Sequence, residues 1–208
     1  MERLAAEDLF ESLEGEEEQS IIEFKKEDNP NLEHITKAFF ASYKGILLKN
    51  SWSRDLDFYT CLECVPSYTA QDIFNFTYIF NDILEKNFKF PIPDTAGIFL
   101  SALSHKCTDE TSHLPLHVIS YSLSYIGFHN NGKHIIIQGN VGDDLGSQMS
   151  KGTIKLNGNT LASIGYGMTG GSIHLEGKYY LSDHYVKYIK KGEIYHKGKL
   201  ILKDGKRV

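Results

Sequence analysis

The chain lacks the features of a membrane protein, a disulfide-bonded protein and a nucleic-acid-binding protein. No apolar run approaches the roughly 18 residues of a membrane helix, and the acidic first residues lack the apolar core of a signal peptide. Three cysteines among 208 residues do not make a disulfide framework. A formal net charge of −5 gives no reason to expect nucleic-acid binding. We therefore expect a cytoplasmic protein with reduced thiols, and with neither a membrane nor a nucleic acid as partner.

Charge is uneven along the chain. Residues 1–30 carry eleven acidic and three basic side chains, a net −8, whereas residues 187–208 carry eight basic and two acidic ones, a net +6. The glutamate run at 14–18 favours a mobile segment. Charged ends are commonly solvated, but opposite charges also steer contact between ends, within one chain or between two copies.

Residues 1–111 are expected to form a helical region after this mobile acidic start. Apolar side chains at helical spacing predict helices over 32–47, 69–86 and about 94–105. Each apolar stripe is interpreted as core, because a stripe at this spacing is the usual buried face of a helix.

Local signals predict how some of these segments begin and what lies between them. Thr69 is expected to cap the second helix, and Asp94 or Thr95 the third. Segment 59–65 is interpreted as a strand, although 51–68 is hard to assign. Segment 114–128 alternates and is expected to be extended.

Residues 112–208 are expected to form a β-solenoid, because the sequence repeats at a period of 19 residues. Such a repeat indicates coils that bury their apolar side only against neighbouring coils. The glycines are expected at corners, where a Cβ would be penalised. The repeat aligns Gly139 with Gly158 and Gly177, Gly146 with Gly165, Met149 with Met168, Ile154 with Ile173, and Leu156 with Leu175.

The strand of each coil has the pattern Gly-x-Ile-x-Leu-x-Gly. Side chains alternate along a strand, so one set of columns should face inward and the columns between them outward. A two-residue insertion precedes the last matching strand, at 192–198, and His196 stands there in place of leucine. The inward columns are Ile135/Ile154/Ile173/Ile194 and Ile137/Leu156/Leu175, and the outward column is Ile136/Lys155/His174/Tyr195.

Residues 132–198 resemble a known family of repeats. Gly139–Gly142, Gly146, 149–154 and 166–173 are similar to the GXGXG repeats found in two enzymes: in the C-terminal domain of the glutamate synthase large subunit, and in the GXGXG-containing subunit of formylmethanofuran dehydrogenase. The resemblance implies a right-handed parallel β-helix of about 19-residue coils. It implies a scaffold beside catalytic parts and carries over no catalytic residue.

Cys61-Leu62-Glu63-Cys64 is the local motif of chemical interest. Two thiolates at this spacing can chelate zinc or form a redox pair. Zinc prefers four ligands, and His105 and Cys107 can complete a set with Cys61 and Cys64. The alternative is that these are small buried core residues, which is common for free cysteine.

Other candidate sites have weaker sequence support. The glycines at 139–146 and 165–171 lack the strand and helix context of a phosphate-binding loop, and the repeat already explains them. The outward ladder of Lys155, His174 and Tyr195 can bind an anion or a sugar, or be solvated surface.

The sequence therefore predicts an α+β protein, with a helical N-terminal half packed on a short β-helix. No Ser/His/Asp or two-carboxylate spacing is recognisable, so the leading hypothesis is a non-enzymatic scaffold or protein-interaction module that binds a protein partner or associates with itself. One alternative is a small zinc protein or enzyme with a site near Cys61, Cys64, His105 and Cys107. Another is an accessory subunit of a redox or amidotransferase-type complex. No other cofactor is expected.

Overall fold

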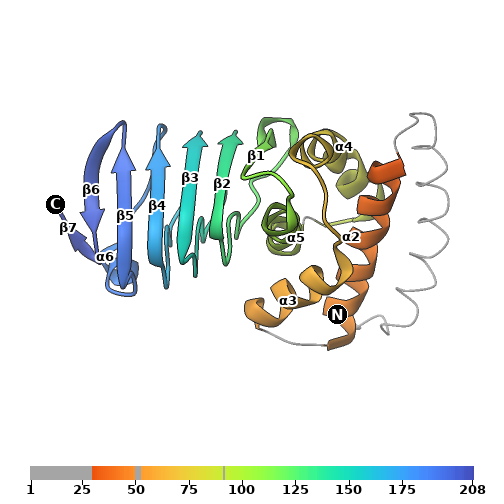
Figure 1. Ribbon diagram of the computed structural model, residues 1–208, viewed down its shortest axis with the longest axis horizontal. Helices are drawn as coiled ribbons and strands as arrows, with labels where there is room; N and C mark the ends of the chain where they lie inside the picture. The colour runs from red at the N-terminus through yellow and green to blue at the C-terminus, as the bar shows by residue number, and fades with distance from the viewer. Residues whose placement is uncertain (1–29, 50–52, 91) are drawn as a thin grey trace.

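The fold is α+β, with a helical N-terminal half and a C-terminal β-solenoid, in a computed structural model that describes residues 30–49, 53–90 and 92–208 (Figure 1). The predicted mobile acidic start lies outside the described residues. The helices are α2 (Pro30–Lys49), α3 (Arg54–Cys64), α4 (Ala70–Asn87), α5 (Pro93–Lys106) and α6 (Asp183–Val186), with a 3-10 turn, η1 (Leu116–Val118). The strands are β1 (Thr111–Leu114), β2 (Asn131–Gln138), β3 (Lys151–Asn157), β4 (Thr169–Leu175), β5 (Lys191–His196), β6 (Lys199–Lys203) and β7 (Lys206–Arg207).

The helical half forms around phenylalanines from three helices. The ring of Phe39 on α2 lies 4.9 Å from that of Phe80 on α4 and 5.1 Å from that of Phe99 on α5, centroid to centroid. All three side chains are fully buried. Thr69 caps α4 as predicted, in a reciprocal capping box with Asp72. The predicted stripes are thus core.

Three local predictions were wrong. Segment 59–65 lies in helix α3 and the residue after it. Ser53 caps the start of this helix, and the helix buries one face through Phe58 and Cys61, which are three residues apart. Asp94 does not cap α5, which begins at Pro93 without a side-chain cap. Segment 114–128 is mostly turns and the 3-10 turn η1, because it forms the non-strand side of the first coil.

The solenoid has the predicted register. Within the described residues, seven strands form one sheet in sequence order, with β1 to β5 parallel and β5 to β7 antiparallel. Ile135 pairs with Ile154, Ile154 with Ile173, and Ile173 with Ile194 across the insertion. All four isoleucines are at most 2% exposed. Each coil therefore stacks aliphatic side chains on those of the coil before it.

The corners bring backbone against backbone, as the glycine pattern predicted. A Cβ on Gly158 would lie 2.0 Å from the carbonyl oxygen of Gly139 in the preceding coil, so only glycine fits there. An asparagine ladder reinforces the same corner. The side-chain oxygen of Asn140 accepts from the Asn159 N–H at 2.9 Å, and that of Asn159 accepts from the Lys178 N–H at 2.8 Å.

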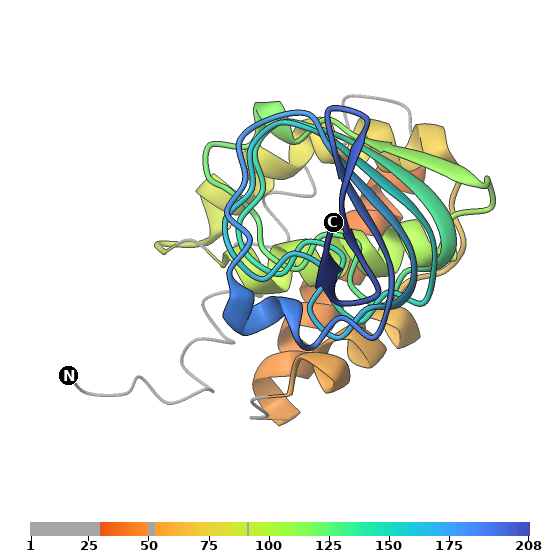
Figure 2. The same ribbon diagram turned by 90° about the vertical axis from the view of Figure 1, so that its left-hand side faces the viewer.

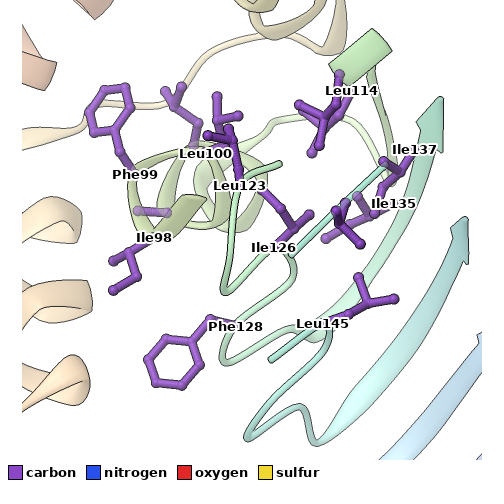
Figure 3. Close-up of a cluster of buried hydrophobic side chains, with 14 of the residues drawn as sticks. Ile98, Phe99, Leu100, Leu114, Leu123, Ile126, Phe128, Ile135, Ile137 and Leu145 are labelled. Atoms are coloured by element: carbon purple, nitrogen blue, oxygen red, sulfur yellow. The ribbon is translucent and has the colours of Figure 1, made fainter. Parts of the chain in front are cut away.

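Helix α5 covers the first coil and joins the two halves. Figure 3 shows Leu100 of α5 beside Leu123 of that coil, and Ile98 and Phe99 on the side of α5 that faces the other helices. These side chains belong to one buried apolar cluster that runs from the helices into the solenoid. The junction is therefore packed with apolar side chains. None of the helices in the described ranges has the length and hydropathy needed to cross a membrane.

Candidate functional site

A groove of about 360 Å³ runs along the turns that precede strands β2, β3 and β4, and we call this side of the solenoid the return face. Helix α3 forms one wall, and the segment containing α6 forms the other. Figures 1 and 2 show both helices projecting on the same side of the solenoid. The volume falls in the range of about 300–1,000 Å³ that is typical of small-molecule sites.

The floor of this return-face groove is built from residues whose backbone is left-handed. Three successive coils place Tyr125, Asp144 and Ser163 one above another at φ values of 60°, 62° and 66°. Gln148, at φ 59°, also lines the groove. A left-handed backbone costs a non-glycine residue about 1–2 kcal/mol, and such strain is concentrated at functional sites. The chain thus holds side chains where glycine would be easier.

The α3 wall contributes an ion network. The guanidinium of Arg54 donates to Asp57 at 3.1 Å and to Asp94 of α5 at 2.6 Å. Its central carbon lies 5.6 Å from the centre of the Tyr125 ring. Burial raises the pKa of Asp57, although Arg54 acts in the opposite direction. This network fixes α3 against α5 and the first coil.

A second polar pair, His129 and Asp55, lies on the same wall. The imidazole Nε2 of His129 lies 2.7 Å from Asp55 Oδ1, and its ring lies 5.1 Å from that of Phe58. His129 is another non-glycine residue with a left-handed backbone, at φ 55°. The carboxylate of Asp55 is therefore already engaged at the groove edge.

Asp144 is the carboxylate at the centre of the floor. Burial raises its pKa, while hydrogen bonds from Ser147 and Tyr125 act in the opposite direction. The Ser147 hydroxyl lies 3.0 Å from Asp144 Oδ1. Burial, and then the charge of Asp144, raise the pKa of Tyr125. The floor therefore combines a half-buried carboxyl, hydroxyls and an amide.

Aromatic rings form the opposite wall. The ring of Tyr166 lies 4.9 Å from that of Tyr188 and 6.2 Å from that of Tyr185. His184 lies beside them, with its ring 5.1 Å from that of Tyr185. Three of these four residues, all but Tyr166, lie in the segment before β5, which contains the two-residue insertion. A segment that departs from the repeat in length therefore forms one side of the groove.

The four residues predicted to bind zinc, Cys61, Cys64, His105 and Cys107, do not line the groove. Cys61 is buried on α3, and Cys64 is half-buried in its last turn. His105 packs its ring 5.7 Å from Phe58, and Cys107 follows α5. Across the described ranges, no three His, Cys, Asp or Glu side chains form a group able to hold a metal ion. These residues give the zinc hypothesis no support, and elemental analysis of the protein remains its test.

The outward ladder predicted on the strand face is present in register. Lys155 pairs with His174, and His174 with Tyr195. The rings of His174 and Tyr195 are stacked 4.7 Å apart with an angle of 2° between their planes. The Tyr195 hydroxyl donates to Glu193 at 2.6 Å. His174 is therefore engaged with Tyr195, and Tyr195 also with Glu193 beside the ladder.

Sequence reasoning missed the return-face groove. One available signal was the 19-residue spacing of Tyr125, Asp144 and Ser163, two residues before the glycines at 127, 146 and 165. Arg54 and Tyr188 carried no comparable signal, because tertiary packing alone brings them to the groove. Comparisons with models of protein families, with curated proteins and with solved structures gave no match.

Proposed function

We propose that this chain is a non-enzymatic interaction module in which the β-solenoid is a scaffold and the return-face groove binds the partner. The observation that carries the proposal is the set of four groove-lining side chains on left-handed backbone. Tyr125 packs against the apolar core and Asp144 accepts from Ser147, so contacts within the fold offset part of this strain. Binding of a partner supplies a further reason for it.

The apolar junction supports an interaction module over an enzyme. A polar, convergent pocket between the halves would favour catalysis, but Leu100, Leu123 and Ile126 are buried there at 0–1% exposure. The hypothesis of a site at this junction therefore has less support than a site on the return face.

The φ pattern supports a relation to the GXGXG repeats. Left-handed residues recur at alternate positions in three coils: 125/127/129, 144/146/148 and 163/165/167. Glycine occupies the middle position of all three, and the outer positions are mostly other residues. We propose that this solenoid is a variant of that repeat in which side chains have replaced outer glycines.

We also propose that copies of this chain associate with one another, which the charge asymmetry of the sequence favours. The C-terminal 22 residues carry a net +6 and lie at the opposite end of the long axis from α2 (Figure 1). The acidic residues 1–30 of one copy can therefore contact the basic end of another. Light scattering at low and high salt tests this: a monomer at both, at high protein concentration, would exclude it.

Site-specific photocrosslinking in cells tests the groove. A photoreactive p-benzoylphenylalanine replaces Tyr188 at the groove rim, where the side chain is 39% exposed, or Tyr78 on α4, where it is 47% exposed. We expect a discrete crosslinked product from position 188 that position 78 does not give. Identical products at both positions, or none at 188, would contradict the proposal.

A further inference from the structure

We propose that the return-face groove binds a neutral oligosaccharide, with pyranose rings against the tyrosine wall and hydroxyls against the polar floor. This inference rests on the proposed function, which makes the groove the binding surface. It adds the chemical class of the ligand. The argument uses the charge balance, the aromatic wall, the polar floor and the backbone of the groove.

The charged side chains that line the groove are largely engaged with protein partners. Arg54 contacts two carboxylates, at 2.6 and 3.1 Å, and Asp55 contacts His129 at 2.7 Å. An anionic ligand such as a phosphate ester needs donors from cations that are not so engaged. Asp144 has no cationic partner among the described residues, but it already accepts from Ser147 at 3.0 Å and burial disfavours its charged form, so it is a weak partner for a cationic ligand. The groove offers recognition by neutral hydrogen bonds instead.

The tyrosine wall suits a ligand with apolar faces and polar edges. Tyr166 and Tyr188 stand at one side with their rings in contact, and Tyr188 is partly exposed. A tyrosine ring buries apolar area while its hydroxyl keeps a hydrogen-bond partner. A pyranose ring has the matching geometry, with C–H groups on its faces and hydroxyls around its edge.

The floor suits the hydroxyls of the same ligand. Ser163 and Gln148 can each donate and accept, and Asp144 accepts when ionised and donates when protonated. A sugar hydroxyl is likewise both donor and acceptor. Three coils, spaced about 4.8 Å apart, give the column of Tyr125, Asp144 and Ser163 a length of about 10 Å, comparable to a disaccharide.

An extended peptide fits this surface less well. A strand-like peptide binds by pairing with open backbone N–H and C=O groups. On the return face these N–H groups already bond to the next coil: that of Tyr125 to Asp143 at 2.9 Å, Asp144 to Ala162 at 3.2 Å, and Gln148 to Tyr166 at 2.8 Å. Side chains, and not backbone, must therefore provide recognition.

Saturation-transfer NMR and calorimetry on the full chain test the ligand class. The probes are maltotriose, cellotriose, mannotriose and chitotriose, with trigalacturonate as an anionic sugar and a lysine-rich peptide as a cation. We expect saturation transfer to at least one neutral trisaccharide. We expect Tyr188→Ala to weaken its binding about tenfold or more, as loss of an aromatic anchor does, and Tyr78→Ala to leave it unchanged.

Asp144→Asn separates neutral from ionic recognition. Asparagine retains a hydrogen-bonding group and tolerates a left-handed backbone, so a neutral sugar should lose less than about threefold in affinity. Preference for trigalacturonate or the peptide would overturn the inference. The inference would also be overturned if none of the sugars bound while photocrosslinking at position 188 succeeded. That result would leave the proposed interaction function standing. Failure of both experiments would overturn both proposals.

Discussion

The hydroxyl of Ser101 accepts a hydrogen bond from the backbone N–H of Gly127 at 2.9 Å. In the next two coils the equivalent N–H groups, of Gly146 and Gly165, bond to carbonyl oxygens of the preceding coil, each at 2.8 Å. The first coil has no preceding coil among the described residues, and α5 supplies the missing oxygen from a side chain. The helix thus acts as a substitute coil.

Replacing this oxygen should destabilise the fold. Ser101→Ala leaves the buried N–H of Gly127 without its partner, which costs about 1–3 kcal/mol in the free energy of unfolding. Ser104→Ala is the matched control on the same helix, because the buried Ser104 hydroxyl has no hydrogen-bond partner among the described residues. We expect Ser104→Ala to be neutral or stabilising. Urea unfolding of both variants checks this. Equal losses in the free energy of unfolding would contradict the conclusion that α5 takes the place of a preceding coil.

The contact of α5 with the first coil should also be intolerant of added volume. A Cβ on Gly97 would lie 1.7 Å from the carbonyl oxygen of Ser124. Gly97→Ala should therefore cost about 1–3 kcal/mol or more, although alanine favours a helix. Gly45→Ala on α2 is the control, since its Cβ would meet only one methyl group, that of Thr60, at 2.8 Å. Thermal and urea unfolding should show a much smaller loss for the control.

The interior columns should carry the stability of the solenoid. Ile173→Ala removes a fully buried side chain between two others of its column, which costs about 2–5 kcal/mol. Lys155→Ala changes an exposed position on the outward column and should stay within about 0.5 kcal/mol of the wild type. Comparable effects of the two variants on the unfolding midpoint would show that the columns are assigned to the wrong faces.

The half-buried carboxyl of Asp144 should make stability depend on pH. Its raised pKa means that the folded state holds the proton to higher pH than the unfolded state. The contribution to stability is thus full below the ordinary value, about 3.9, and is lost as pH rises through the folded pKa. Asp144→Asn does not titrate, so its unfolding free energy relative to wild type should increase with pH in that window.

Unfolding curves of wild type and Asp144→Asn at several pH values measure this difference. Asp82→Asn, at an exposed position on α4, is the control. A difference between wild type and Asp144→Asn that does not change with pH would show that the carboxyl is as well hydrated in the fold as in the unfolded chain.

The cysteines should differ in reactivity. Burial raises the pKa of Cys61 to about 12, so very little thiolate exists at pH 8. Cys107 is also buried, whereas Cys64 is half-buried. We expect a disulfide reagent to label one thiol quickly in the native protein, and Cys64→Ser to remove that fast phase. Rapid labelling of all three thiols would contradict the structure around α3.

The solenoid could be predicted in detail because its rule is repetitive. Inward positions must stack like on like, so the alignment of Ile154 with Ile173 predicts the strand register, and the same rule locates the two-residue insertion before Ile194. Helix α3 escaped prediction because only two of its buried side chains, Phe58 and Cys61, are apolar, too few to display a helical period. Asp94 has the type and position of a capping residue, but Arg54, forty residues away, engages it instead.

The groove could not be predicted for a related reason. Its walls come from Arg54 and Tyr188, which are more than 130 residues apart in the sequence and share no local pattern. The floor did leave a trace in the repeat, because Asp144 and Ser163 stand where the turn would most easily take glycine. Departures from the repeat were thus more informative about the candidate site than the repeat itself.

The strands on either side of residues 179–190 keep Ile173 above Ile194, even though α6, Tyr185 and Tyr188 lie between them. The exposed residues of that excursion can therefore be exchanged or redesigned while the stacked interior stays the same, provided that the buried Leu181, Val186 and Ile189 are kept. A single rod can in this way carry different surfaces at one corner.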